Sequence, residues 1–159
     1  MTAFFDDVQI GDELALGRHV FTREDIIRFA EKYDPQPFHL SEEGAARTHF
    51  GRLCASGWHT AAIFMKLWVE TYEAQKREVL AAGITPAKYG PSPGFEDLKW
   101  LKPVYAGDEL TYSQVVTGKT ESRSRPQWGL IHFQLEAVNQ AGELAFSFKG
   151  NVFLERRRT

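Results

Sequence analysis

The chain has 159 residues and a formal net charge of -2, with 43% hydrophobic and 25% charged residues, which is the composition of one globular domain with a sizeable core. So small a net charge gives no reason to expect nucleic acid or an anionic membrane as a partner, and no apolar run is long enough to cross a bilayer. The first residues lack the basic start and apolar core of a signal peptide, and a single cysteine excludes an internal disulfide, so we expect a cytoplasmic protein.

The first 33 residues predict short strands and one amphipathic helix. Residues 4–16 contain short apolar stretches that end at Gly17, which suggests one or two strands with a turn. Thr22 is a good N-cap, and acidic residues follow it in the first helical turn. Apolar residues then recur at helical spacing up to Tyr33. The helix should therefore pack on one face and end where Pro35 begins.

An acid and an imidazole follow this helix, with two prolines between them. Asp34 and His39 are five positions apart. Proline fixes its own φ and pushes the preceding residue out of the helical region, so Pro35 restricts Asp34 and Pro37 restricts Gln36. We expect a stiff, non-helical loop that holds both groups in place, as general acid–base chemistry requires. The alternative is a polar turn with a capping aspartate and a surface histidine.

Two more helices are expected downstream. Ser41 and Ser56 are suitable N-caps, the first for a short helix that ends near residue 46. The second helix should run about 25 residues and end near Gly83. From Trp58 to Val69 almost every residue is apolar, which predicts that this half is buried on all sides. The charged second half should lie nearer to solvent.

The last third predicts an antiparallel sheet after a Gly- and Pro-rich loop at residues 83–94. Four strands are expected, over residues 95–101, 109–116, 128–138 and 144–154. Residues 118–126 look like a polar connection, residues 139–142 like a hairpin turn, and Gly150 like part of a bulge. The whole chain, 1–159, is expected to form a single α+β domain whose sheet wraps around the long helix.

Three segments resemble the MaoC-like dehydratases and (R)-specific enoyl-CoA hydratases. Residues 34–39, D-P-Q-P-F-H, resemble the signature D-x-N-P-x-H of that family. Residues 50–57, F-G-R-L-C-A-S-G, match its segment before the central helix, and residues 101–110, L-K-P-V-Y-A-G-D-E-L, resemble its entry into the sheet. The resemblance implies the hotdog fold and a homodimer or higher homo-oligomer. Gln36 and Ser56 stand where the family often has Asn and His, which leaves the choice of substrate open.

The resemblance also implies a hydro-lyase acting on an acyl thioester, most simply the reversible hydration of an enoyl-CoA to a 3-hydroxyacyl-CoA. Coenzyme A would be part of the substrate, and no separate cofactor is implied. Hydration needs groups that move protons and donors for an enolate-like oxygen. Asp34 and His39 are assigned the first role jointly. The Gly57 N–H, at a helix N-terminus, is the expected oxyanion donor, with Ser56 and Gln36 as further contacts in the substrate pocket. Ser56 could instead be a plain N-cap.

Two other functions remain open, a hotdog acyl-CoA thioesterase and a non-catalytic subunit that binds acyl thioesters.

The chain has no CxxC, HExxH or His-rich tract, so we expect no metal site. Cys54 has apolar neighbours, which favours a small buried residue over a nucleophile. His59 is expected in the core or in solvent, and Trp58 and Trp100 in the core or in the wall of an acyl pocket. The segment from residue 72 to 94 either caps that pocket or only joins the helix to the sheet.

Overall fold

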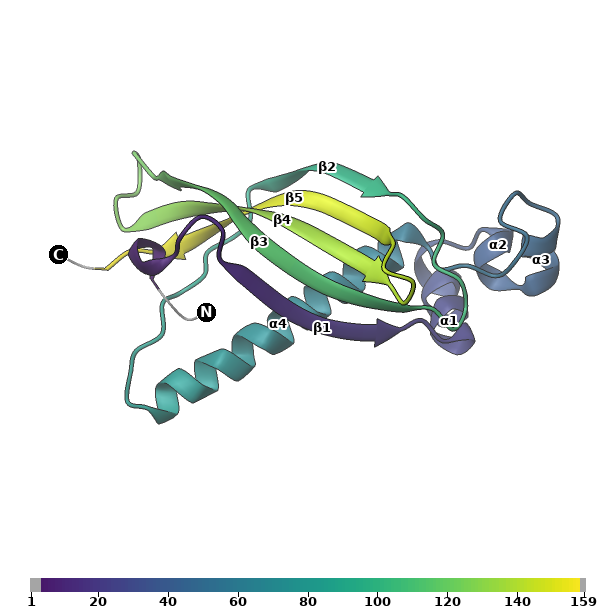
Figure 1. Ribbon diagram of the computed structural model, residues 1–159, viewed down its shortest axis with the longest axis horizontal. Helices are drawn as coiled ribbons and strands as arrows, with labels where there is room; N and C mark the ends of the chain where they lie inside the picture. Colours follow the sequence, from purple (N-terminus) through teal and green to yellow (C-terminus); the bar gives the residue numbers. More distant parts are fainter. Residues whose placement is uncertain (1–3, 158–159) are drawn as a thin grey trace.

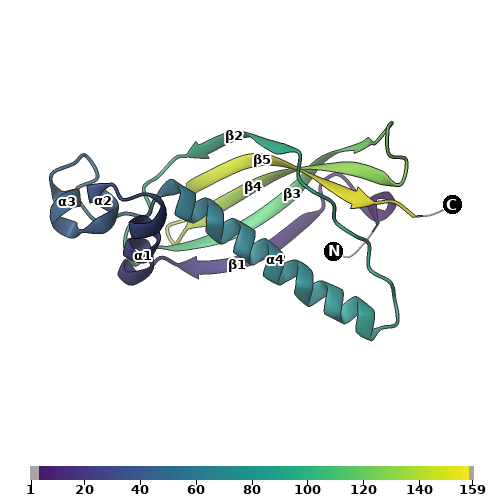
Figure 2. The ribbon, with the colours of Figure 1, turned by 180° about the vertical axis from the view of Figure 1, so that it is seen from behind.

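The computed structural model describes residues 4–157, and its centre is an antiparallel sheet crossed by one long helix (Figures 1 and 2). The elements in chain order are η1 (Phe5–Asp7), β1 (Glu13–Val20), α1 (Arg23–Tyr33), α2 (Pro37–Leu40), α3 (Glu42–Ala46), α4 (Gly57–Ala81), β2 (Gly94–Trp100), β3 (Glu109–Glu121), β4 (Trp128–Asn139) and β5 (Leu144–Glu155). The five strands pair antiparallel in the order β1-β3-β4-β5-β2. The predicted α+β architecture, a sheet packed around a long helix, is confirmed.

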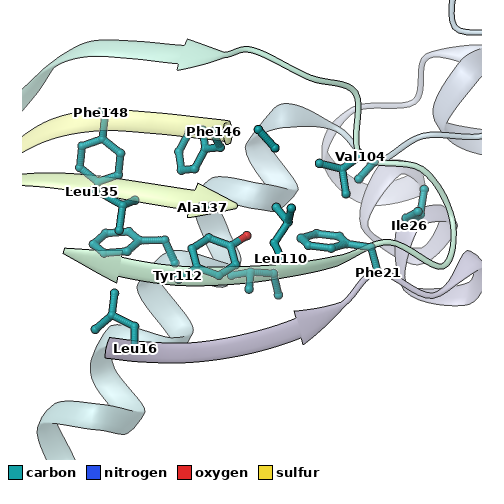
Figure 3. Packing of buried hydrophobic residues seen from close by; sticks show 14 of the residues in the cluster. Leu16, Phe21, Ile26, Val104, Leu110, Tyr112, Leu135, Ala137, Phe146 and Phe148 are labelled. Carbon is teal, nitrogen blue, oxygen red and sulfur yellow. The ribbon is translucent and has the colours of Figure 1, made fainter. Parts of the chain in front are cut away.

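The core lies between α4 and one face of the sheet. Strand β4 alternates as its sequence predicts, with Phe133, Leu135 and Ala137 all buried. Figure 3 shows side chains of neighbouring strands gathered on this face, Leu135 beside Phe148 and Tyr112. The Tyr112 hydroxyl donates a hydrogen bond to the Thr60 carbonyl, at 3.1 Å. This bond ties the middle of the sheet to the first turn of α4, where the candidate site is built.

Helix α4 has the predicted length and N-cap, but it is not buried on all sides. It spans 25 residues, and the Ser56 Oγ accepts a hydrogen bond from the Trp58 N–H. Phe64 is buried against the sheet, whereas Trp58 and Met65 are 54% and 53% exposed. The sheet covers one side of the first half only, and the second half extends beyond the strands (Figure 2). The apolar run therefore covers two faces of α4, one packed in the core and the other exposed.

Three details of the predicted strands are wrong. Gly17 does not end the first strand but lies inside β1, where the pairing register shifts and φ reaches +121°. Strand β3 continues to Glu121 across a second irregularity, so the connection to β4 is shorter than expected. Gly150 is not in a bulge, because it pairs in regular register with Phe133. A side chain at 150 would collide with the Phe133 ring, which is why glycine stands there.

The stretch after α1 is only partly a loop. Helix α1 begins after the predicted N-cap Thr22 and ends at Tyr33, with Asp34 as its C-cap, so it stops before Pro35 as expected. His39, however, lies in the one-turn helix α2, which begins at Pro37. Proline suits the first helical position, because its φ is already helical and an N–H there needs no helical partner. The stiff, non-helical part is thus limited to Asp34, Pro35 and Gln36.

Candidate active site

The Asp34 carboxylate is fixed by two hydrogen bonds. Gln36 Nε2 donates to Oδ1 at 2.8 Å, and Ser56 Oγ donates to Oδ2 at 2.7 Å. Burial acts to raise the pKa of Asp34, but the hydrogen bonds from Ser56 and Gln36 and the nearby His39 outweigh it and hold that pKa below its ordinary value. Asp34 is therefore a carboxylate at neutral pH, and its orientation is set from two sides.

The His39 ring is buried, and the backbone sets its tautomer. Nδ1 lies 2.7 Å from the Cys54 carbonyl oxygen. Because a carbonyl can only accept, Nδ1 carries the hydrogen and donates it. The other ring nitrogen, Nε2, lies 3.4 Å from Asp34 Oδ2, which is long for a direct hydrogen bond. In the neutral ring both Nε2 and Oδ2 are acceptors, so a single water beside the pair could donate one hydrogen to each.

A short extended segment around Cys54 brings the two halves of the site together. The Cys54 N–H donates to the Phe38 carbonyl at 3.2 Å, and the Ala55 N–H donates to the Val104 carbonyl at 2.7 Å. The segment is thus held between α2 and the loop that precedes β3. Cys54 itself is 1% exposed, and burial raises the pKa of its thiol to about 11. It is the small buried residue that its apolar neighbours predict, and not a nucleophile.

Gly57, the first residue of α4, lies at the same site. The first N–H groups of a helix have no helical carbonyl to bind, and the positive end of the helix dipole is there. Gly57 lines one cavity of about 420 Å³ together with Asp34, Gln36 and His39. The packing of a neighbouring side chain explains why this position is a glycine. A Cβ at this position would lie 2.3 Å from the Trp100 indole, so glycine admits a tryptophan rather than a ligand.

The structure thus gathers Asp34, Gln36, His39, Ser56 and Gly57, the five residues singled out in the sequence, around one cavity or in direct contact with its lining. The remaining walls are mostly apolar and come from loops, from α2, from the start of α4 and from the strands β2 and β5, and they include Phe38, Phe50, Trp100 and Pro103. Phe38, Phe50 and Pro103 fall within the three segments that resemble the family, but the sequence does not predict that they line a cavity, because that depends on tertiary contacts. The loop before β2 reaches a second cavity, which Tyr89, Gly90 and Ser92 help to line.

His59 is outside this cavity and lies in the core, as one of the two predicted alternatives had it. Its ring stacks on Phe29 with centroids 4.6 Å apart and also contacts His19 and Phe21. His59 Nδ1 and His19 Nε2 are buried without a hydrogen-bond partner among residues 4–157. Burial, with a smaller effect of His19, lowers the pKa of His59 to about 4. The folded protein therefore keeps this ring neutral well below the pH at which an unfolded chain protonates it.

We expect His59 to make the protein sensitive to acid. The unfolded chain binds a proton here near pH 6.5 and the folded protein only near pH 4, so stability is lost as pH falls through this window, by roughly 3 kcal/mol in full. In His59→Phe the free energy of unfolding should fall less between pH 7 and pH 4.5 than in the wild type, as urea denaturation would measure. The exposed His49→Asn variant should keep the wild-type pH slope. Equal slopes in His59→Phe and the wild type would contradict this explanation.

In the described part of the chain, no three His, Cys, Asp or Glu side chains are grouped so that they could hold a metal ion. No helix between residues 4 and 157 is both long and apolar enough to span a membrane.

An antiparallel sheet around one long helix is the hotdog fold, and in this chain an Asp–His pair lies beside the N-terminus of that helix. The sequence model of the MaoC like domain matches residues 7–129. The chain belongs to the MaoC-like dehydratase family.

Relatives of similar length support this placement. The crystal structure of the MaoC-like dehydratase from Rhodospirillum rubrum is 35% identical and has a TM-score of 0.81, and the match covers 99% of each chain. The uncharacterized protein YdeM of Bacillus subtilis is 30% identical over 95% of this chain and 98% of its own length. The (R)-hydratase from A. caviae involved in PHA biosynthesis is 23% identical with a TM-score of 0.64, over 92% of this chain and 96% of that one, which shows a shared fold.

Proposed function

We propose that this protein is a hydro-lyase that adds water reversibly to the double bond of an enoyl-CoA and forms a 3-hydroxyacyl-CoA. The observation that carries the proposal is the 3.4 Å gap between His39 Nε2 and Asp34 Oδ2. Because Nδ1 donates to the Cys54 carbonyl, Nε2 is left with a free lone pair. Nε2 and Asp34 Oδ2 can therefore both accept hydrogen bonds from the same water. Family membership and the hydratase among the structural relatives agree with this chemistry.

The reaction assigns work to both members of the pair. The water oxygen forms a bond to C3 of the enoyl group and gives up a proton to the Asp34–His39 pair, while C2 receives a proton from the same pair. The proton count therefore balances without another reactant, and dehydration is the reverse path. The lowered pKa of Asp34 keeps its carboxylate ionised and able to orient the water.

The thioester oxygen gains negative charge as C3 is attacked, and it needs a donor. We assign this role to the Gly57 N–H, because that residue begins α4 and lines the cavity that contains Asp34 and His39. Ser56 then has two tasks, since its Oγ caps α4 and also donates to Asp34. Gln36 also positions the Asp34 carboxylate, through its hydrogen bond to Oδ1.

The experiment that tests the proposal is a panel of enoyl-CoA and 3-hydroxyacyl-CoA substrates, followed by the ultraviolet absorbance of the conjugated thioester. Hydration of crotonyl-CoA should remove this absorbance without releasing a thiol. Release of free coenzyme A instead would identify a thioesterase. Binding of the thioester with no turnover would identify a non-catalytic subunit.

We also propose that the functional unit is a homodimer that covers the β2 edge. Strand β2 ends the sheet, and its Phe95 is 57% exposed; on the neighbouring α4, Met65 is exposed as well. An open strand edge beside apolar side chains is a surface that a second chain can cover.

Sedimentation equilibrium should therefore give about twice the chain mass of 18.1 kDa. Phe95→Glu should shift the equilibrium toward the monomer, because it places a charge in the covered edge. The matched variant Val20→Glu changes an exposed apolar residue of β1, at the other edge of the sheet, and should remain a dimer. A monomeric wild type, or equal behaviour of the two variants, would contradict this assembly.

A further inference from the structure

Two cavities meet at one side chain, Trp58. The first is the cavity of about 420 Å³ that contains Asp34 and His39. The second, of about 490 Å³, lies between α4 and the strands β2, β4 and β5. Of the residues that the structure describes, Trp58 alone lines both. Its indole therefore stands between the acid–base pair and the second cavity.

The second cavity suits an apolar group. Its walls include Phe64 of α4, Leu98 of β2, Phe133 of β4 and Phe148 of β5. No Asp, Glu, Lys, Arg or His is among its described lining residues. A hydrocarbon chain would leave water favourably here, whereas a carboxylated chain would find no charged partner for its carboxylate. The space beyond Trp58 thus has the chemistry of an acyl site.

Trp58 is packed in place at the start of α4. Its ring meets the Trp100 ring edge to face, with centroids 5.1 Å apart and an interplanar angle of 80°. Trp100 in turn lies against Gly57, where any Cβ would collide with the indole. Glycine and the two tryptophans form one packed unit beside the catalytic pair, so the Trp58 ring is held from the side of β2.

We propose that Trp58 is a specificity-determining residue, a wall that confines the acyl group to the catalytic cavity and closes the second cavity to it. This inference rests on the proposed hydratase function and adds the class of substrate. A crotonyl group fits in front of the indole, whereas an octenoyl chain has to pass it. The protein should therefore act on short enoyl thioesters and discriminate against chains that need the second cavity.

The test compares kcat/KM for crotonyl-CoA and trans-2-octenoyl-CoA in the wild type, Trp58→Ala and Trp58→Phe. The wild type should favour crotonyl-CoA. Removing the indole should raise the octenoyl-to-crotonyl ratio about tenfold or more, the size of effect that a few methylenes in an apolar pocket produce. Trp58→Phe should raise the ratio less, and it carries the test if the alanine variant does not fold.

A second substitution checks where the longer chain goes. Ala61 lies on the next turn of α4 and lines the second cavity, so Ala61→Phe in the Trp58→Ala background should bring the ratio back toward the wild-type value. The proposed role of Trp58 would be overturned by a wild type that hydrates both substrates equally well, or by an octenoyl-to-crotonyl ratio that both Trp58 variants leave unchanged. Neither result would overturn the hydratase assignment. A wild type that hydrates neither substrate would overturn the proposed function, and this inference with it.

Discussion

Asp34→Asn is expected to lower kcat/KM for crotonyl-CoA hydration by roughly 10²- to 10⁴-fold, the usual contribution of a positioned acid–base group. Asparagine has the shape of aspartate, and its amide oxygen can still accept the Ser56 hydrogen bond that now holds Oδ2. Its amide nitrogen can donate to Gln36 Oε1 once the Gln36 amide is reversed, which replaces the present bond to Oδ1. It carries no negative charge and cannot take a proton from water. The loss would therefore be chemical and not structural. Initial rates from the loss of thioester absorbance, with thermal melting as the check on folding, measure it.

The matched control is Glu31→Gln, which makes the same change from carboxylate to amide one turn earlier on α1. Glu31 is exposed, so this variant should keep the wild-type rate. If Asp34→Asn retained full activity, Asp34 would have no acid–base role, and its low pKa would reflect only its hydrogen bonds to Ser56 and Gln36 and the nearby His39. If both variants lost activity alike, the effect would belong to α1 as a whole.

The sequence predicts the backbone around Asp34 well, because local conformational rules determine it. Two prolines restrict the residues before them, and a good N-cap with helical periodicity leads up to Asp34. Ser56 is recognisable as an N-cap for the same reason. Its hydrogen bond to Asp34 joins residues 22 positions apart, however, and no local pattern specifies such a contact. The same holds for the Cys54 carbonyl, which orients His39 across 15 positions.

The course of α4 shows a second limit. Its apolar run predicts a buried helix, and hydrophobicity alone cannot tell a residue that faces the core from one that faces a cavity or another chain. Phe64 does face the core, whereas Trp58 lines two cavities. Gly57 illustrates the same point. A Cβ there would collide with Trp100, which lies 43 positions later in the sequence, at the end of β2. These contacts depend on the tertiary fold.

Two substitutions at His39 are expected to lower activity alike and to differ in stability. The ring has two separate tasks, because Nδ1 donates to the buried Cys54 carbonyl and Nε2 faces Asp34. In His39→Asn the amide nitrogen stands near the place of Nδ1 and can keep the bond to Cys54. In His39→Gln the longer amide reaches toward the place of Nε2 and leaves the carbonyl without its donor. Neither amide has a basic nitrogen.

Hydration of crotonyl-CoA should therefore fall by roughly 10²-fold or more in both variants. Urea denaturation should show His39→Asn close to the wild type and His39→Gln less stable by about 1–3 kcal/mol, the cost of an unpaired buried polar group. Activity that followed stability instead, with His39→Asn nearly as active as the wild type, would mean that His39 acts only by holding the segment around Cys54. Equal loss of activity at unequal stability separates the two tasks, because both variants lack a basic nitrogen facing Asp34 but only one of them leaves the Cys54 carbonyl without its donor.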